Sequence, residues 1–159
     1  MSESAETLTE IRKRLKGRTL LVGRRIGQDK FDALGASLRA EAKPQKYPIG
    51  GKVIAWETGL LGKFSRGDFD SIILHRFLYK PVKEYIEDPI EILAETKRIL
   101  PDGGVLVVNS FLLDDTTRSF RSAESFYRES EMMSMLEDQD FRNVMHVNIG
   151  GTHLFVCER

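Results

Sequence analysis

Short apolar runs recur along the chain, and each is closed by glycine, proline or a polar residue. Three of these runs, at 19–23, 70–75 and 104–109, contain three or four consecutive aliphatic residues without polar alternation. This pattern is typical of strands that are buried on both faces of a parallel sheet covered by helices. We therefore expect these three strands to be central and parallel.

Apolar residues at helical spacing predict helices between the strands in the first half of the chain. Thr7 and Glu10 have the spacing of a capping box, and an apolar stripe follows them up to Gly17. Residues 28–42 repeat the helical spacing and stop before Pro44, which disfavours helix in the preceding residue. We interpret the first segment as a lead-in helix and the second as the first crossover helix.

The middle of the chain holds a further strand and a well-marked helix. The pattern of residues 53–56 predicts a strand that ends as the chain reaches Glu57. A glycine-rich loop follows it. Asp88, Pro89 and Glu91 combine an N-cap acid, a proline at the first helical position and a capping-box glutamate. The sequence Pro-Asp-Gly-Gly at 101–104 then predicts the end of this helix and a turn into the next strand.

The last part of the chain predicts one more helix and then a hairpin. The helix is expected from the spacing of Ala123, Phe126, Tyr127 and Met133. Alternating residues that end at Ile149 and the final run 152–158 flank a Gly-Gly pair, which is a hairpin signal. Strands alternating with helices before a hairpin predict an α/β fold with a mainly parallel sheet and an antiparallel edge region.

Composition excludes several classes of protein. The chain has 159 residues, 41% hydrophobic and 30% charged, which is usual for a globular domain. One cysteine and three histidines give no disulfide framework and no zinc-type spacing, so we expect no metal site. There is no apolar run long enough for a bilayer and no signal-peptide pattern near Met1, so we expect no membrane contact and a cytoplasmic location.

The charge is balanced overall but divided along the chain. Lys and Arg minus Asp and Glu gives 17 − 9 = +8 for residues 1–83 and 7 − 15 = −8 for residues 84–159. This division fits a basic face for an anionic polymer, head-to-tail association into a homo-oligomer, or charged faces that are simply solvated. Of these three interpretations, charged faces that are simply solvated are favoured.

The second half of the chain resembles the class I S-adenosylmethionine (SAM)-dependent methyltransferases. In that family the fourth strand starts with Phe-Asp and ends near His or Asn, as in the segment from Phe69-Asp70 to His75. A helix ending in Leu-(Lys)-Pro-Gly-Gly then leads to the fifth strand, as at 100–108. The resemblance covers about 68–159, including the terminal Gly-Gly hairpin. It implies a three-layer Rossmann-like methyltransferase fold.

The resemblance implies one domain over 1–159. Its parts are a lead-in helix at 1–17, a shortened cofactor half at 18–67 and a well-matched half at 68–159. Only 45 residues separate Gly23 from Phe69, about a strand and a helix fewer than the family normally has. We expect a strand-helix unit to be reduced to a loop.

The glycine loop that holds SAM in the family is only partly present. The family has an acid and Gly-x-Gly-x-Gly after the first strand, because glycine lets the backbone approach the cofactor. Here Gly23 and Gly27 match, whereas Arg25 replaces the middle glycine and Leu21 the acid. Arg24 and Arg25 could cover an anion, could be solvated, or Arg25 could block the pocket. A plain strand-to-helix turn is the competing interpretation.

Other contacts to the cofactor are inferred from the resemblance alone. The acid that binds the ribose at the end of the second strand has no clear counterpart. Glu57 and Thr58 resemble the third-strand end that faces the adenine, although Glu57 could equally be an ordinary exposed acid. Strand order should reverse between the first and fourth strands, which brings His75 near Gly23. His75 is then either a candidate general base or a strand-end histidine hydrogen-bonded to a loop.

Two functions remain open on this evidence. One is a SAM-dependent methyltransferase with an unknown small-molecule or macromolecular acceptor. The other is a methyltransferase-like pseudoenzyme that has lost the cofactor and serves as a binding or assembly module for a small molecule or protein. A different nucleotide-binding α/β protein is less favoured because the terminal hairpin is unusual there. Because the loop and the ribose acid are altered, we expect weak or absent SAM binding.

Overall fold

Seven strands form a single sheet in the computed structural model of the chain, which describes residues 5–23, 32–41, 53–55, 59–81, 88–113 and 126–159. The strand order is β3-β2-β1-β4-β5-β7-β6. Neighbours from β3 to β5 pair in parallel, and β7 is antiparallel to both β5 and β6. The strands are β1 Thr19–Gly23, β2 Leu38–Glu41, β3 Val53–Ala55, β4 Ser71–His75, β5 Val105–Ser110, β6 Arg142–Ile149 and β7 Thr152–Glu158.

The three central strands confirm the prediction from the apolar runs. Every residue of β1, β4 and β5 is buried. They lie side by side in parallel, with β7 antiparallel beside β5. Residues without polar alternation form such strands because both faces of the sheet are covered.

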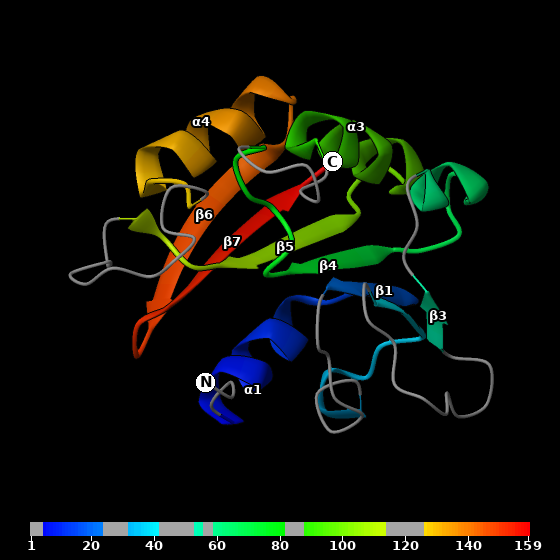
Figure 1. Ribbon diagram of the computed structural model, residues 1–159. Coiled ribbons are helices and arrows are strands. Elements are labelled where there is room, and N and C mark those ends of the chain that lie inside the picture. The colour runs from blue at the N-terminus through cyan, green and yellow to red at the C-terminus, as the bar shows by residue number, and fades with distance from the viewer. Residues whose placement is uncertain (1–4, 24–31, 42–52, 56–58, 82–87, 114–125) are drawn as a thin grey trace.

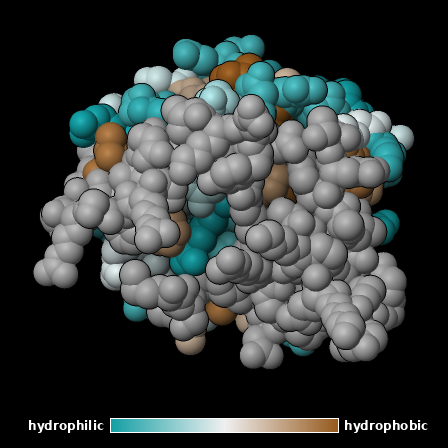
Figure 2. Space-filling model, in the orientation of Figure 1, coloured by the Kyte–Doolittle hydropathy of each residue, from teal (hydrophilic) through white to brown (hydrophobic). Residues whose placement is uncertain are grey.

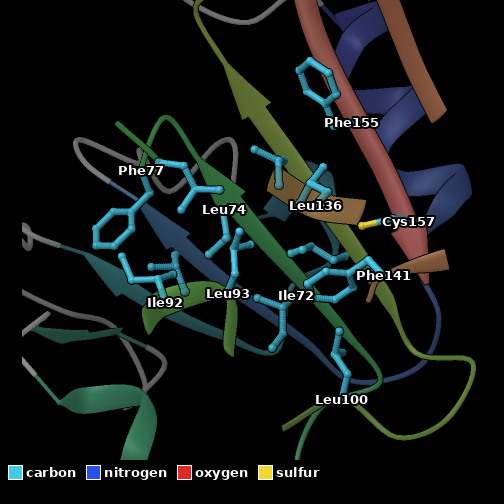
Figure 3. Packing of buried hydrophobic residues seen from close by; sticks show 14 of the residues in the cluster. Ile72, Leu74, Phe77, Ile92, Leu93, Leu100, Leu136, Phe141, Phe155 and Cys157 are labelled. Atoms are coloured by element: carbon cyan, nitrogen blue, oxygen red, sulfur yellow. The ribbon is translucent and has the colours of Figure 1, made fainter. Parts of the chain in front are cut away.

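Helices cover the sheet on both faces and give the fold three layers. Figure 1 shows α3 (Pro89–Ile99) and α4 (Glu129–Asp138) on one face and α1 (Ala5–Arg14) on the other. The larger hydrophobic core lies under α3 and α4, and a second one lies under α1 around Ile11, Leu21 and Ile73. Figure 3 shows the larger core, in which side chains of β4 meet those of α3, α4 and β7.

The start of α3 follows the signals in the sequence. The side chain of Asp88 accepts a hydrogen bond from the backbone N–H of Ile90 at 3.0 Å, and Pro89 occupies the first turn. The predicted turn also forms, because the N–H of Gly104 donates to the carbonyl of Pro101 at 2.8 Å. A Cβ on Gly104 would lie 2.9 Å from that carbonyl oxygen, so the tight turn requires glycine there.

The predicted crossover helix at 28–42 is wrong in its second half. Residues 32–34 are helical, but Gly35 has a φ of +66° and Leu38–Glu41 form strand β2. Left-handed backbone at glycine ends a helix, and β2 then pairs in parallel with β1. The expected loss of a strand is therefore also wrong, since β2 and β3 are both present. Among the described residues between β3 and β4, the one helical element is the four-residue 3-10 helix η1 (Leu60–Lys63).

The last helix begins later than its apolar spacing predicts. Phe126 and Tyr127 precede α4, and Tyr127 forms an isolated parallel bridge with Leu112. The helix begins at Glu129 because the side chain of Glu131 accepts the backbone N–H of Arg128 at 3.0 Å and caps this end. Ala123 lies outside the described residues. Both aromatic residues are buried without being helical.

The terminal hairpin forms as predicted. Gly150 and Gly151 connect β6 to β7 with φ values of +57° and +90°. Positive φ at both central residues is what a two-residue turn of type I′ requires, and glycine adopts it without strain.

The outer surface of the helical layer is mainly polar. On the face in Figure 2, hydrophilic residues dominate over α3 and α4, and hydrophobic ones appear singly. Single exposed apolar residues are normal for a protein surface. None of the described helices is long and apolar enough to cross a membrane.

Candidate functional site

Four residues at the carboxyl ends of the parallel strands lie in one row across the sheet. Gly23 pairs with Glu41 of β2 on one side and with His75 of β4 on the other, and His75 pairs with Asn109 of β5. The strand order reverses between β1 and β4, as predicted. In open α/β sheets, ligands bind outside the carboxyl ends of the strands at such a reversal. This row is the candidate site.

Glu41 is the functional candidate that the sequence reasoning missed. It is the last residue of β2, directly beside the last residue of β1. The helical spacing of 28–42 concealed it, because that interpretation placed Glu41 inside a helix. Gly35 is the signal that could have revealed the strand, since glycine is a frequent helix stop.

His75 is enclosed at the end of β4. It is 2% exposed, as is its neighbour Asn109 in β5. Because side chains alternate along a strand, His75 shares the face of Ile73, which packs in the core under α1. The next residue, Arg76, turns the chain with a φ of +50°, and its N–H donates to the carbonyl of Asn109 at 2.7 Å.

The other predicted cofactor contacts lie outside the described residues. These are Arg25 and Gly27, which follow β1, and Glu57 and Thr58, which follow β3. The strand before Glu57 is indeed the third along the chain, and it lies at the edge of the sheet beside β2.

An aromatic cluster of Tyr79, Phe111 and Phe126 lies beside the row. The ring of Phe126 is 5.6 Å from that of Phe111 and 5.9 Å from that of Tyr79. The guanidinium of Arg76 lies over Phe111, 4.5 Å from the ring centre. Tyr79 follows β4, Phe111 follows β5 and Phe126 precedes α4. The segments at the carboxyl edge of the sheet therefore bring the three rings together. The rings pack on one another with the cation above Phe111, and Phe126 is only 5% exposed.

The neighbouring Tyr127 is held as a neutral phenol. Burial, with smaller contributions from Glu131 and Asp88, raises its pKa from 10.0 to about 12. Glu131 is paired with Lys80 at 3.1 Å, and its pKa is lowered, first by the N–H of Arg128 and then by Lys80. These groups serve the fold at this end of α4.

A second polar group at the same edge consists of Glu129, His146 and His153. Nδ1 of His146 lies 3.0 Å from Oε1 of Glu129, and Nε2 of His146 lies 2.8 Å from Nδ1 of His153. The two histidines are seven residues apart and come together because they flank the hairpin turn. His153 pairs with Ser110, the last residue of β5. Among the described residues, no group of three or more His, Cys, Asp or Glu side chains is arranged to hold a metal ion.

Comparison with known proteins agrees with this topology. No family model matches the sequence, and curated proteins give no significant match. A SAM-dependent methyltransferase from Thermotoga maritima has a TM-score of 0.69 at 17% identity, over 95% of this chain and 86% of that one. One from Aquifex aeolicus has a TM-score of 0.69 at 16% identity, over 97% and 88%.

A longer protein has the same fold over part of its length. Human N-acetylserotonin methyltransferase in complex with SAM has a TM-score of 0.60 at 16% identity, over 88% of this chain and 47% of that chain. At identities this low, the structural likeness establishes the fold alone. With its strand order and these structural neighbours, the chain has the fold of the class I SAM-dependent methyltransferases.

Proposed function

We propose that this protein binds SAM at the carboxyl edge of β1 and β2 and is a methyltransferase. The observation that carries the proposal is the position of Glu41 beside Gly23. The resemblance implies an acid at the end of the second strand, and the sequence alone offered none. Glu41 supplies an acid at that position.

The residues present fit the chemistry of this cofactor. A carboxylate at Glu41 would accept hydrogen bonds from the two ribose hydroxyls. Gly23 has no Cβ and would let the backbone approach the methionine portion. The resemblance implies that Glu57 and Thr58 face the adenine. When bound, SAM supplies a methyl group on a positively charged sulfur.

The chain's own contribution to methyl transfer would be mainly positioning. Displacement at a methyl carbon needs the acceptor in line with the carbon–sulfur bond, and orientation supplies much of the rate. The acceptor would lie on the β4 and β5 side of the row, next to the aromatic cluster.

Calorimetric titration with SAM tests the proposal. We expect binding by the wild-type protein and a loss of about 10- to 100-fold in affinity in Glu41→Gln, because a charge-assisted hydrogen bond contributes about 1.5–3 kcal/mol. Glu137→Gln is the matched control, an exposed acid near the end of α4. Gly23→Arg should abolish binding.

Absence of binding by the wild-type protein would overturn the proposal. The non-catalytic binding or assembly module would then be the better interpretation, with Arg25 in the loop as its cause. Equal affinity in Glu41→Gln and wild type would show that another residue holds the ribose.

A further inference from the structure

We propose that residues 12–18 form a docking surface for the phosphate backbone of a nucleic acid. This stretch, Arg-Lys-Arg-Leu-Lys-Gly-Arg, holds five basic residues in seven positions. It comprises the end of α1 and the turn that leads into β1, and we name it the basic segment. The surface goes beyond the candidate site and does not depend on SAM.

The basic segment exposes four of its five cations. Ile11, just before the segment, is buried against the sheet, so the opposite side of α1 faces outward. Arg12 and Lys13 are exposed on the helix, and Lys16 and Arg18 are exposed in the turn. Because α1 covers the face of the sheet opposite α3 and α4 (Figure 1), these cations lie away from the two acidic-half helices.

Among the described residues, none of the four exposed cations forms an ion pair with a carboxylate. Arg12 and Lys16 each donate to a backbone carbonyl oxygen at 3.3 Å. The guanidinium of Arg18 lies over the ring of Phe69, 5.3 Å from its centre. A carbonyl or an aromatic ring attracts a cation without cancelling its charge. Several cations elsewhere in the structure do pair with an acid, namely Arg66, Lys80 and Lys97.

Two acids beside the basic segment are engaged by other groups. Glu10 accepts from Arg14 at 2.8 Å, and its pKa is lowered first by this hydrogen bond, with a smaller effect from the charge of Lys13. The carboxylate of Asp70 accepts the backbone N–H of Arg18 at 3.1 Å. Residues 5–18 hold five basic and two acidic residues, a net charge of 5 − 2 = +3. The local charge is therefore positive.

The turn of the basic segment is held firmly on the start of β4. The backbone N–H of Lys16 donates to Oγ of Ser71 at 2.7 Å, and that hydroxyl donates to the carbonyl of Lys16 at 2.8 Å. Gly17 has a φ of +51°, and a Cβ there would overlap the carboxylate of Asp70. Lys16 and Arg18 therefore extend from a fixed backbone, which lowers the entropy cost of docking.

Other classes of partner fit this surface less well. A helix that binds a membrane needs an exposed apolar face, whereas Leu8, Ile11 and Leu15 of this region pack in the second core. A stable protein interface has an apolar centre. One exposed apolar residue, Met145, lies beside Arg14, which is too little for such a centre. Contacts to phosphates need only cations and do not depend on base sequence.

The basic segment is separate from the candidate site. Strand β1 begins at Thr19, directly after the segment, and ends at Gly23 of the row. Four steps of about 3.3 Å put roughly 13 Å between these two positions. A nucleic acid bound at the amino edge of the sheet would leave the carboxyl edge open. The docking surface and the proposed function can therefore fail independently of one another.

Fluorescence anisotropy with two labelled probes tests the proposal, on the full chain without SAM. The probes are a mixed-sequence DNA duplex and a single-stranded oligouridine, which present the same phosphate chemistry in two forms. If each of the four exposed cations contacts a phosphate, the affinity for the duplex should fall about 150-fold between about 0.05 and 0.2 M salt, because each contact contributes about −0.9 to the slope of log affinity against log salt. Binding of either probe with such a salt dependence supports the proposal.

Paired lysine substitutions locate the surface. Lys13→Gln with Lys16→Gln removes two of the four contacts and should reduce the fall over the same salt range to about 12-fold. Lys63→Gln with Lys97→Gln is the matched control, because it removes the same charge from η1 and α3 on the other face of the sheet. The control should keep the salt dependence of the wild-type protein. Circular dichroism checks that both variants are folded.

Three outcomes would overturn the proposal. The first is no change in anisotropy with either probe at low salt. The second is an equal loss of affinity in both double variants, because overall charge rather than the basic segment would then control binding. The third is self-association that Lys13→Gln with Lys16→Gln removes while neither probe binds, which would assign the basic segment to the acidic half of a second copy.

Discussion

The thiol of Cys157 lies in the larger core, and its surroundings control its chemistry (Figure 3). Burial, and secondarily the carboxylate of Glu158, raises its pKa from 9.0 to about 12. The reactive thiolate is therefore scarce in the folded protein at mildly alkaline pH. We expect iodoacetamide to label Cys157 slowly in native protein and rapidly in denaturant, as measured by mass spectrometry. Equal labelling rates would mean that this part of the core opens readily.

The same shift has a consequence for stability. The folded protein holds the thiol proton more tightly than the unfolded chain does. The neutral buried thiol contributes fully below pH 9.0, and this contribution is lost as pH rises toward about 12. Cys157→Ala should lack this alkaline component in a pH series of denaturant unfolding curves.

At the scale of single elements, α3 depends on its N-cap residue, Asp88. Asp88 satisfies one of the backbone N–H groups that the first turn leaves without a helical partner. Asp88→Ala should lower the free energy of unfolding by about 0.5–2 kcal/mol, whereas Asp88→Asn keeps an acceptor and should cost only a few tenths. Denaturant unfolding measures both. A similar loss in the two variants would show that the charge, rather than the cap, stabilises the helix.

Among the described residues, the two oppositely charged halves of the sequence supply different strands of the sheet. The basic residues 1–83 supply strands β3, β2, β1 and β4, and the acidic residues 84–159 supply β5, β7 and β6. The boundary lies between β4 and β5. Two described helices cross this boundary: α1 of the basic half packs against β5 and β7, and α3 of the acidic half packs against η1.

This arrangement favours head-to-tail association of copies when salt is low. The screening length falls from about 30 Å at 0.01 M to about 8 Å at 0.15 M ionic strength. We therefore expect sedimentation velocity to detect association at low salt that disappears as salt is raised. A single species at every salt concentration would support the solvated reading of the charges. Addition of heparin at low salt separates self-association from binding of an anionic polymer.

Local sequence determined the elements whose signals are local. Unbroken apolar runs produced β1, β4 and β5, because burial on both faces selects such residues. Asp88-Pro89 began α3, and Gly150-Gly151 closed the hairpin, because caps and tight turns depend on neighbouring residues alone. With the motif at 69–75, these elements were sufficient to predict the methyltransferase fold and the place where the strand order reverses.

Tertiary structure decided what depends on partners distant in the sequence. Leu38–Glu41 have too few residues to show a period, and they become a strand because β1 supplies the hydrogen bonds. Tyr127 is extended because it pairs with Leu112, although its spacing fits a helix. The contacts of His146 with His153 and Glu129 arise from strand register and from the docking of α4. Each of these positions is set by contacts between two segments that are distant in the sequence. Such contacts produce no periodic pattern of residues within either segment, so the sequence alone does not reveal them.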